Sequence, residues 1–526
     1  MKYIILVGNR QFIYNWEKQI LDKIKKHNSQ VLLVVGNQIE TNKRSINYSA
    51  YYIFKFIEKI IYFFLNNGKK SELFEKLFIK DLDYKTEFVK VDNSNGRDEI
   101  ISYNKTYENQ IVIRLGFGIL SESTIKTFGG TIYSLHHGDI IKFRGGPVGF
   151  WEMVKNEKRA NITLQVINEH LDSGEVVLYG SILLNEFSYY KSLDLIYGKG
   201  IDLYYELIES LSEKKIVPSS KTSFLINPIK KRPLNYLMIK ILLNLYSKKL
   251  FYAIYKLYYE VYWEVYIRKK PKSGRVISFE NKFRISSTNK RYYADPYLFK
   301  KYLFVEDYCY KKQKGLISIL DLNGKIIKYD LFNSDSHRSF PQIIEYKNKV
   351  LIMTESQELN SLEVYQINMS NWSLKLEFKI SKVSIVDPSF IINETLYILG
   401  CIRMQSYGTA DDNLVCYKIS EIEGNYNFEK ININTKLPIF SRRPASGQIN
   451  SNNMFFQYNK DKYGQSIILA NFSIDQNGFN VYSDEIPLTF EENKGQSQVE
   501  GHTYNESHEY ITYDRRKYIP RWKKYI

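Results

Sequence analysis

In the first part of the chain, short apolar runs alternate with stretches of helical periodicity. Residues 16–26 repeat apolar positions at the spacing of a helix and lie between two such runs. The predicted strands are residues 3–7, 31–35, 87–91, 110–115 and 131–135. Alternation of this kind is typical of parallel sheets covered by helices. We therefore predict an α/β Rossmann-like domain over residues 1–225.

After about residue 276 the pattern changes to short strands separated by turn residues. Five segments share one order: a Pro or His turn, an apolar strand, a polar turn and a second apolar strand. They are residues 294–306, 339–356, 386–399, 442–457 and 500–512. Pro296, Pro341 and Pro388, which mark the first three, are 45 and 47 residues apart. This spacing matches a propeller blade, so residues 276–526 are predicted to form an all-β five-bladed propeller.

The segment between these domains, residues 226–275, is basic and very apolar. Apolar residues recur at helical spacing from Leu234 to Val265, which predicts a helical connector. Two interpretations stay open. The apolar residues pack between the domains, which we favour, or the segment lies on an anionic membrane surface. Charges interrupt every apolar run before a membrane span is reached. Residues 51–65 have the same character, and we expect them in a core or an interface.

The net charge of +17 is concentrated in this connector. Residues 230–275 contain twelve Lys or Arg against two acidic residues, which accounts for +10 of the total. Neither folded half carries a basic patch of its own, so we expect no nucleic-acid partner.

The cysteines and glycines exclude several kinds of site. Three widely spaced cysteines are too few for a disulfide framework or a Cys-x-x-Cys metal site, and we predict no metal. The first residues contain no signal-peptide pattern. A cytoplasmic location is therefore expected. Gly8, Gly116 and Gly118 do not form the G-x-G-x-x-G fingerprint of dinucleotide-binding domains.

The candidate chemistry begins where the last predicted strand of the first domain ends. Two histidines stand side by side in Ser134-Leu135-His136-His137-Gly138-Asp139. A glycine-rich turn, Phe143-Arg144-Gly145-Gly146-Pro147, and then Leu171-Asp172-Ser173-Gly174 follow. An imidazole such as that of His136 exchanges a proton near neutral pH, and a carboxylate such as that of Asp172 can orient it. Open α/β sheets bind ligands at this edge.

Taken in order, these motifs resemble those of the formyltransferase family, which includes the methionyl-tRNA, glycinamide ribonucleotide and sugar N-formyltransferases. The resemblance covers residues 1 to about 215 and implies 10-formyltetrahydrofolate as the donor and a primary amine as the acceptor. It implies that His136 is the catalytic imidazole and that Asp172 positions it. Residues expected at the donor site are Arg114, Gly116, His137, Gly145 and Gly146.

One position departs from the family pattern. Ser134 stands where the family has an asparagine whose amide donates a hydrogen bond to the oxyanion. Loss of one such donor typically lowers the rate about 100- to 1000-fold. A serine hydroxyl also donates, and His137 is a possible substitute donor. We therefore expect Ser134 in the catalytic group.

Residues 275–520 resemble the five-bladed propellers related to glycoside hydrolases, in particular the domain of glucosamine inositolphosphorylceramide transferase-like proteins. The resemblance lies in motifs such as Ala294-Asp295-Pro296 and Asp387-Pro388-Ser389. Propeller hydrolases use carboxylates as acid and base. The candidate sugar-contacting residues are Asp295, Asp387, Glu355 or Glu500, His337 and His502. A structural role is the alternative for each: the Asp-Pro carboxylates would cap turn N–H groups, and the histidines would be buried donors.

Together the two resemblances predict an enzyme that transfers a formyl group to the amine of an amino sugar, nucleotide-linked or lipid-linked, in surface polysaccharide biosynthesis. Two alternatives stay open. One is a glycosidase or glycosyltransferase acting through the propeller, with an inactive first domain. The other is a carbohydrate-binding protein without catalytic activity.

Overall fold

The computed structural model describes most of the chain. The described residues are 2–8, 11–27, 29–37, 46–93, 97–100, 110–129, 131–140, 142–167, 174–213, 228–270, 277–278, 282–285, 291–402, 413–422, 424–448, 452–483, 487, 489–492, 495–498, 501–507 and 509–524. They form two compact units. The first runs Met1–Phe251, and the second comprises Tyr252–Met404 and Ala410–Ile526.

An eight-stranded sheet forms the centre of the first unit, in the order β10-β9-β8-β7-β1-β3-β5-β6. Its strands are β1 (Lys2–Leu6), β3 (Gln30–Asn37), β5 (Lys85–Asp92), β6 (Glu99–Ile100), β7 (Gln110–Arg114), β8 (Ile132–His136), β9 (Arg159–Val166) and β10 (Glu175–Leu183). The five predicted strands are confirmed as β1, β3, β5, β7 and β8, which pair in parallel. Since β3 and β7 flank β1, the direction in which the chain adds strands reverses at β1.

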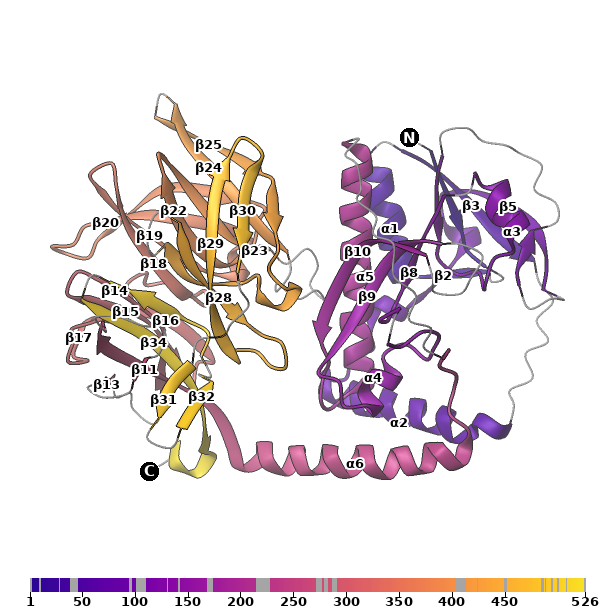
Figure 1. The fold of residues 1–526 in the computed structure, drawn as a ribbon, viewed down its shortest axis with the longest axis horizontal. Helices are drawn as coiled ribbons and strands as arrows, with labels where there is room; N and C mark the ends of the chain where they lie inside the picture. Colours follow the sequence, from indigo (N-terminus) through magenta and orange to yellow (C-terminus); the bar gives the residue numbers. More distant parts are fainter. Residues whose placement is uncertain are drawn as a thin grey trace. The chain divides into compact units, whose positions relative to one another are not determined.

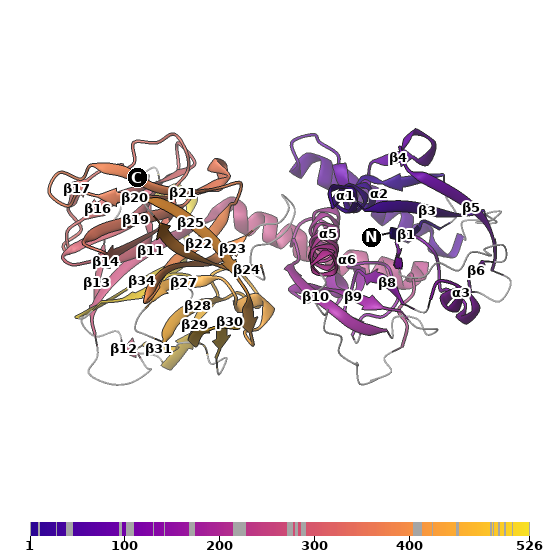
Figure 2. The ribbon, with the colours of Figure 1, turned by 90° about the horizontal axis from the view of Figure 1, so that it is seen from above.

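Helices cover both faces of this sheet. Helices α1 (Asn15–Lys26) and α5 (Tyr189–Ser212) pack on one face, and α3 (Glu122–Thr127) packs on the other, as Figure 2 shows. Successive residues of β1 divide between the two cores, because Ile5 belongs to the first and Ile4 to the second. Burial on both faces explains why these strands read as continuous apolar runs.

A third core lies among α2 (Ser49–Leu65), α4 (Phe150–Val154), α5 and α6 (Asn235–Tyr258). Glu58 of α2 is fully buried there and contacts the ammonium group of Lys249 on α6. Its other oxygen accepts a hydrogen bond from the N–H of Tyr189, at the start of α5. A short pair, β2 (Phe12–Tyr14) with β4 (Lys76–Phe78), lies beside α1. None of the helices described has the length and apolar character needed to cross a membrane.

The helical prediction for residues beyond Tyr258 is wrong. Helix α6 ends there, and Tyr259–Lys269 form strand β11, so Val261, Tyr262 and Val265 are strand residues. β11 pairs along its whole length with β34 (Tyr510–Pro520), near the end of the chain. Tyr, Val, Trp and Ile fill this strand, and such residues favour a pleated, buried strand when a partner is present.

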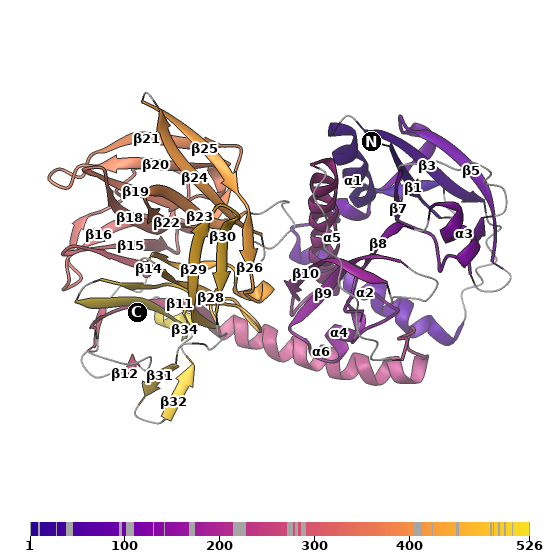
Figure 3. The same cartoon turned by 45° about the horizontal axis from the view of Figure 1, so that its top comes forward.

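The second unit is built from five sheets of at least four strands each, visible in Figures 1 and 3. Their strands are β14 (Arg291–Phe299), β15 (Tyr302–Cys309), β16 (Lys314–Leu320) and β17 (Ile326–Lys328); β18 (Ser339–Tyr346), β19 (Lys349–Glu355), β20 (Ser361–Ile367) and β21 (Leu374–Ser381); β22 (Ile385–Asn393), β23 (Thr395–Ile402), β24 (Leu414–Ile422) and β25 (Asn425–Ile431); β26 (Ile433–Thr435), β27 (Pro444–Gln448), β28 (Asn453–Tyr458), β29 (Ser466–Asp475) and β30 (Gly478–Tyr482); and β33 (Tyr504–Glu506), β34, β11 and β13 (Lys282–Ile285). The first strands of the five predicted segments contact one another in a closed ring, β14-β18-β22-β27-β33. A small additional sheet joins β12 (Ile277–Ser278), β31 (Thr489–Glu492) and β32 (Gly495–Gln498). The predicted architecture, an α/β domain followed by an all-β five-bladed propeller, is confirmed.

Three strands of this ring carry the same backbone distortion. Asp295, Phe340 and Asp387 each precede a proline and have φ of 48°, 50° and 49°. A residue before proline is ordinarily extended, so a positive φ at this place is strained. The strand register shifts at each of the three positions. A bulge therefore recurs at one level of the ring in three blades.

Candidate active site

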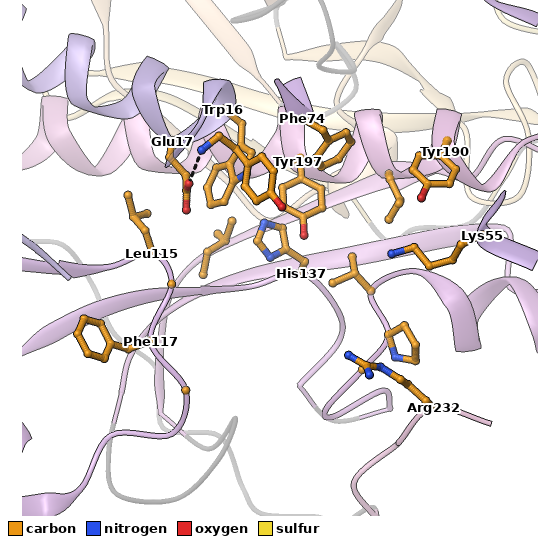
Figure 4. Close-up of a pocket in the computed structure, with 18 of the residues that line it drawn as sticks. Trp16, Glu17, Lys55, Phe74, Leu115, Phe117, His137, Tyr190, Tyr197 and Arg232 are labelled. Atoms are coloured by element: carbon orange, nitrogen blue, oxygen red, sulfur yellow. Dashed lines mark hydrogen bonds between the residues drawn. The ribbon is translucent and has the colours of Figure 1, made fainter. Parts of the chain in front are cut away.

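A large cavity in the first unit lies at the carboxyl ends of the parallel strands. Its volume is about 1480 Å³, and Figure 4 shows part of its lining. The lining includes the loop after β7, the end of β8 and the start of α1. Ligands of open α/β sheets bind where the strand order reverses, which here is at β1. Single-ligand pockets are typically about 300–1000 Å³, so this cavity has room for a donor and an acceptor together.

The close approach of two loops at this edge depends on Gly8. Its φ is +58°, and a Cβ there would lie 2.2 Å from the carbonyl oxygen of Gly116. We expect Gly8→Ala to lower the free energy of unfolding by several kcal/mol, because backbone would have to move as well as adopt a strained φ. Gly129→Ala is the matched control, since Gly129 has φ +82° but open space around it. Equal losses in urea unfolding of the two variants would contradict this expectation.

Ser134 and Arg114 form a pair at the cavity. They are register partners on β8 and β7, and the Arg114 Nη1 donates a hydrogen bond to the Ser134 Oγ over 2.8 Å. The Nε of Arg114 donates to the carbonyl of Gly118. Because Ser134 accepts from a cation, its own O–H is left to donate elsewhere. Both residues line the cavity, as does Gly116.

His136 is the last residue of β8 and lies beside the lining residues rather than among them. Its Nε2 is 3.4 Å from the carbonyl oxygen of Phe143, within the glycine-rich turn. Gly138 makes room for the ring, because a Cβ there would lie 2.9 Å from Nε2. Glu152 of α4 is buried and interacts electrostatically with His136; burial raises the pKa of this carboxyl to about 7. The sequence analysis missed Glu152, which no motif marks.

His137 lies inside the cavity, under Tyr197 and Trp16 (Figure 4). The centroid of its ring is 4.1 Å from that of Tyr197. Burial, with a smaller contribution from His136, lowers the pKa of His137 to about 3, so the imidazole is neutral. Its Nε2 has no hydrogen-bond partner in the part of the chain that the structure describes. A buried polar atom of this kind is available to a ligand.

The Gly145-Gly146 turn is held by the backbone that leads to α6. Lys230 donates its N–H to the carbonyl of Arg144 and accepts from the N–H of Gly146. A Cβ on Gly145 would lie 2.4 Å from the Lys230 carbonyl oxygen, so the residue must be glycine for this approach. Gly146 lines the cavity, and Gly145 lies behind it.

Asp172 lies outside the described residues. Gly174, two residues later, is buried and donates its N–H to the side-chain oxygen of Gln165. Gln165 on β9 is in turn the register partner of Ser134.

Basic residues at the cavity are a feature that the sequence analysis did not find. Lys55 and Lys59 of α2 and Lys230, Lys231 and Arg232 before α6 all contribute to the lining. Burial, the charge of Lys59 and the charge of Arg232 lower the pKa of Lys55. No described carboxylate forms an ion pair with any of the five. Only the folded arrangement of α2 and residues 230–232 brings these charges together.

In the second unit, Asp295 and His502 belong to one buried network. The His502 Nε2 is 3.0 Å from Asp295 Oδ1, and its Nδ1 is 2.8 Å from Asp514 Oδ2. Burial alone would lower the pKa of His502, but the charges of Asp514 and Asp295 outweigh it and hold this pKa well above its usual value. The second oxygen of Asp295 accepts the N–H of Phe340 in the next blade. The ligand atoms of the three residues lie within 4.8 Å of one another, a spacing that also admits a cation.

Asp387 and Glu355 form a second group. The Arg443 Nε is 2.6 Å from Asp387 Oδ2, and Glu355 accepts the N–H of Asp387 from the neighbouring blade. Burial raises the pKa of Asp387 to about 7. The Nδ1 of His337 accepts the N–H of Gly315, and its Nε2 is 3.8 Å from Glu306 Oε1. Glu500 is outside the described residues.

The C-terminal half, residues 273–513, matches the family model described as glucosamine inositolphosphorylceramide transferase 1, N-terminal. Among curated proteins, the methionyl-tRNA formyltransferase of Caldanaerobacter subterraneus subsp. tengcongensis is 25% identical over 127 residues, which cover 23% of this chain and 40% of that protein. A second methionyl-tRNA formyltransferase, from Thermodesulfovibrio yellowstonii, is also 25% identical over 127 residues, covering 24% and 41%. The chain therefore spans about two fifths of the length of these relatives.

Solved formyltransferases are similar at low identity. The phosphoribosylglycinamide formyltransferase of Anaplasma phagocytophilum is 14% identical, with a TM-score of 0.29 over 42% of this chain and 95% of that one. The N-formyltransferase of Helicobacter canadensis, solved with folinic acid and dTDP-3-aminofucose, is 14% identical, with a TM-score of 0.27 over 58% and 95%. Both expected resemblances are confirmed. The chain joins an α/β unit similar to the formyltransferases to a five-bladed propeller that matches the glucosamine inositolphosphorylceramide transferase 1 N-terminal model.

Proposed function

We propose that this protein transfers a formyl group from 10-formyltetrahydrofolate to the primary amine of an amino sugar. The observation that carries the proposal is the Ser134–Arg114 pair at the cavity. Ser134 stands two residues before His136, at the position where the formyltransferase motif that this segment resembles has an asparagine. The unpartnered Nε2 of His137 and the volume of the cavity fit a pterin beside an acceptor. The donor supplies an activated formyl carbon when bound.

The residues have distinct proposed roles. The Ser134 hydroxyl donates a hydrogen bond to the oxygen that gains negative charge as the amine attacks, and Arg114 polarises that hydroxyl from behind. His136 accepts the proton that the amine loses when its nitrogen bonds to the formyl carbon, and that proton passes to the departing nitrogen of the donor. Asp172 orients His136. His137, Gly116, Gly145 and Gly146 are proposed to shape the donor site.

The basic residues around Lys55 point to an acceptor that carries negative charge. A phosphate or diphosphate between an amino sugar and its nucleotide or lipid carrier has this chemistry, and lysine and arginine recognise it by charge and by forked hydrogen bonds. Amino sugars on such carriers are building blocks of surface polysaccharides. We propose that role, and a cytoplasmic location, for this protein.

The proposal is tested by incubating the full chain with 10-formyltetrahydrofolate and two matched acceptors, a diphosphate-linked amino sugar and the same sugar free. We expect a product heavier by one formyl group, with kcat/KM at least about tenfold higher for the diphosphate-linked acceptor, because Lys55 and Arg232 engage the phosphates. The same sugar with a hydroxyl in place of the amine is the control. Absence of the formylated product across a panel of such amino sugars would overturn the proposal.

A second candidate is acid–base chemistry on a carbohydrate by the propeller. The observation in its favour is that two buried carboxylates of the propeller have different partners, His502 at Asp295 and Arg443 at Asp387. The charge of His502 outweighs burial and lowers the pKa of Asp295, whereas burial raises that of Asp387 to about 7. Two carboxyls whose surroundings shift their pKa values in opposite directions are suited to act as a general base and a general acid. Loss of activity in Asp295→Ala but not in His136→Ala would favour this candidate.

A further inference from the structure

Helix α2 exposes an apolar stripe where a surface helix is ordinarily polar. Its buried side carries Tyr51, Phe54 and Tyr62. A second stripe recurs at i, i+3, i+4, i+7, i+10 and i+11, and all six of its residues are exposed: Ile53, Phe56, Ile57, Ile60, Phe63 and Phe64. The side chain of Phe64 is 75% exposed. A helix that is apolar on both sides belongs in a core or against a lipid phase.

Helix α6 has the same property. Only Met238, Ile241 and Lys249 are buried along its 24 residues. Within the first unit, the exposed stripe on the opposite side recurs at i, i+3, i+7 and i+14, and consists of Tyr236, Ile239, Leu243 and Leu250. Leu243 is 72% exposed. The part of α6 that belongs to the first unit therefore exposes an apolar side within that unit, and packing of this segment between the domains stays a prediction.

The two helices lie side by side along the first part of α6 (Figures 1 and 3). The Asn235 side chain accepts the N–H of Ala50, and the Tyr246 hydroxyl donates to Glu58. We call the exposed stripes of α2 and α6 the apolar face. Residues 49–70 and 228–258, which contain it, hold eleven Lys or Arg and a single acidic residue, Glu58, which is buried and paired with Lys249. Five of the eleven line the cavity, which leaves five exposed lysines outside it: Lys69, Lys70, Lys240, Lys248 and Lys256.

We propose that the apolar face is seated in the headgroup region of an anionic lipid bilayer. The side chains of the apolar stripes would contact acyl chains instead of water. Exposed lysines such as Lys240 and Lys248 would reach the lipid phosphates. The charge of these segments favours an anionic membrane over other partners. They expose lysines but no acidic side chain, and an anionic membrane attracts Lys and Arg near its surface. Neither helix crosses the bilayer. This surface is independent of the proposed formyl transfer, because it is the exposed side of α2 and α6.

The test is sedimentation of the full chain with phosphatidylcholine vesicles, with and without phosphatidylglycerol. We expect binding to the anionic vesicles at low salt and a large loss at 1 M salt, where the Debye length is about 3 Å. Ile239→Glu with Leu243→Glu should lower partitioning at least about 100-fold, since two large apolar side chains are removed from the lipid. Lys240→Gln with Lys248→Gln should lower it roughly 30-fold.

The control variant carries Leu376→Glu and Ile422→Glu, which change exposed apolar residues of the propeller. It should bind as the unaltered chain does, and thermal melts should show that all variants are folded. Three results would overturn the proposal: no binding to anionic vesicles at low salt, equal binding to neutral vesicles, or a dimer in light scattering that Ile239→Glu dissolves while vesicle binding is absent. The last result would assign the apolar face to a second copy of the chain.

Discussion

The His136→Ala variant is expected to transfer formyl groups about 100- to 10,000-fold more slowly than the unaltered protein, which is the range for removal of a positioned acid–base group. Its effect should fall on kcat, because the imidazole lies beside the cavity lining and contributes little to the space that holds the substrates. The measurement is a steady-state assay with 10-formyltetrahydrofolate and an amino-sugar acceptor. His27→Ala, which removes an exposed histidine from the same unit, is the control.

Variants at Ser134 test the proposed hydrogen bond to the oxyanion in the same assay. Ser134→Ala removes the hydroxyl beside Arg114 and should lower kcat about 100- to 1000-fold. Ser134→Asn restores the residue that the formyltransferase family has at this position and should keep most of the activity. If His136→Ala and Ser134→Ala both transfer at the unaltered rate, the roles assigned to this motif are wrong.

The His502→Ala variant is expected to destabilise the propeller by about 3–5 kcal/mol, because Asp295 and Asp514 would be left buried without a cation. Urea unfolding followed by tryptophan fluorescence measures this loss. Trp263 is a suitable reporter, because its ring centroid is 4.2 Å from that of His502. His337→Ala is the matched control. Burial lowers the pKa of His337, so its removal costs a hydrogen bond from Gly315 and no charge, about 1 kcal/mol.

The pH dependence of unfolding gives an independent readout. The folded pKa of His502 lies well above the unfolded value of about 6.5. Its contribution is therefore complete below pH 6.5 and is lost as the pH rises through the folded pKa. In His502→Gln this slope should disappear. A chelator should leave the melting of the unaltered protein unchanged, whereas a fall would show that a cation occupies the site. An unchanged urea midpoint in His502→Ala would contradict the proposed ion network.

The five parallel strands of the first unit were predictable because each is a short apolar run, and the blades because their turn residues repeat at a similar spacing. Other features could not be predicted, because they depend on contacts between residues far apart in the chain. β11 was read as helix, since its partner β34 lies about 250 residues away and nothing local signals the pairing. Sequence placed the Ser134–His136 motif at a strand end correctly. The sequence did not predict the contact between Arg114 and Ser134, because only the parallel register of β7 and β8 brings these two residues together.

The roles of the propeller residues also needed the structure. Asp295 and Asp387 look alike in sequence, each before a proline. In the fold one faces a histidine and the other faces Arg443. Lys55 and Arg232 are 177 residues apart in the chain, and only the packing of α2 against α6 assembles the basic end of the cavity.

The blade that contains β11 and β34 has a consequence for how the protein is made. Strand β11 of this blade is synthesised about 240 residues before β34, the strand with which it pairs along its whole length. At ordinary translation rates of about 5–20 residues per second, that interval is roughly 12–48 s. Throughout it, a strand rich in Tyr, Val, Trp and Ile presents an unpaired edge, the kind of edge that joins other chains. The ring therefore closes only after Tyr510–Pro520 have been synthesised, and a chain that stops before them leaves the propeller open between β11 and its partner.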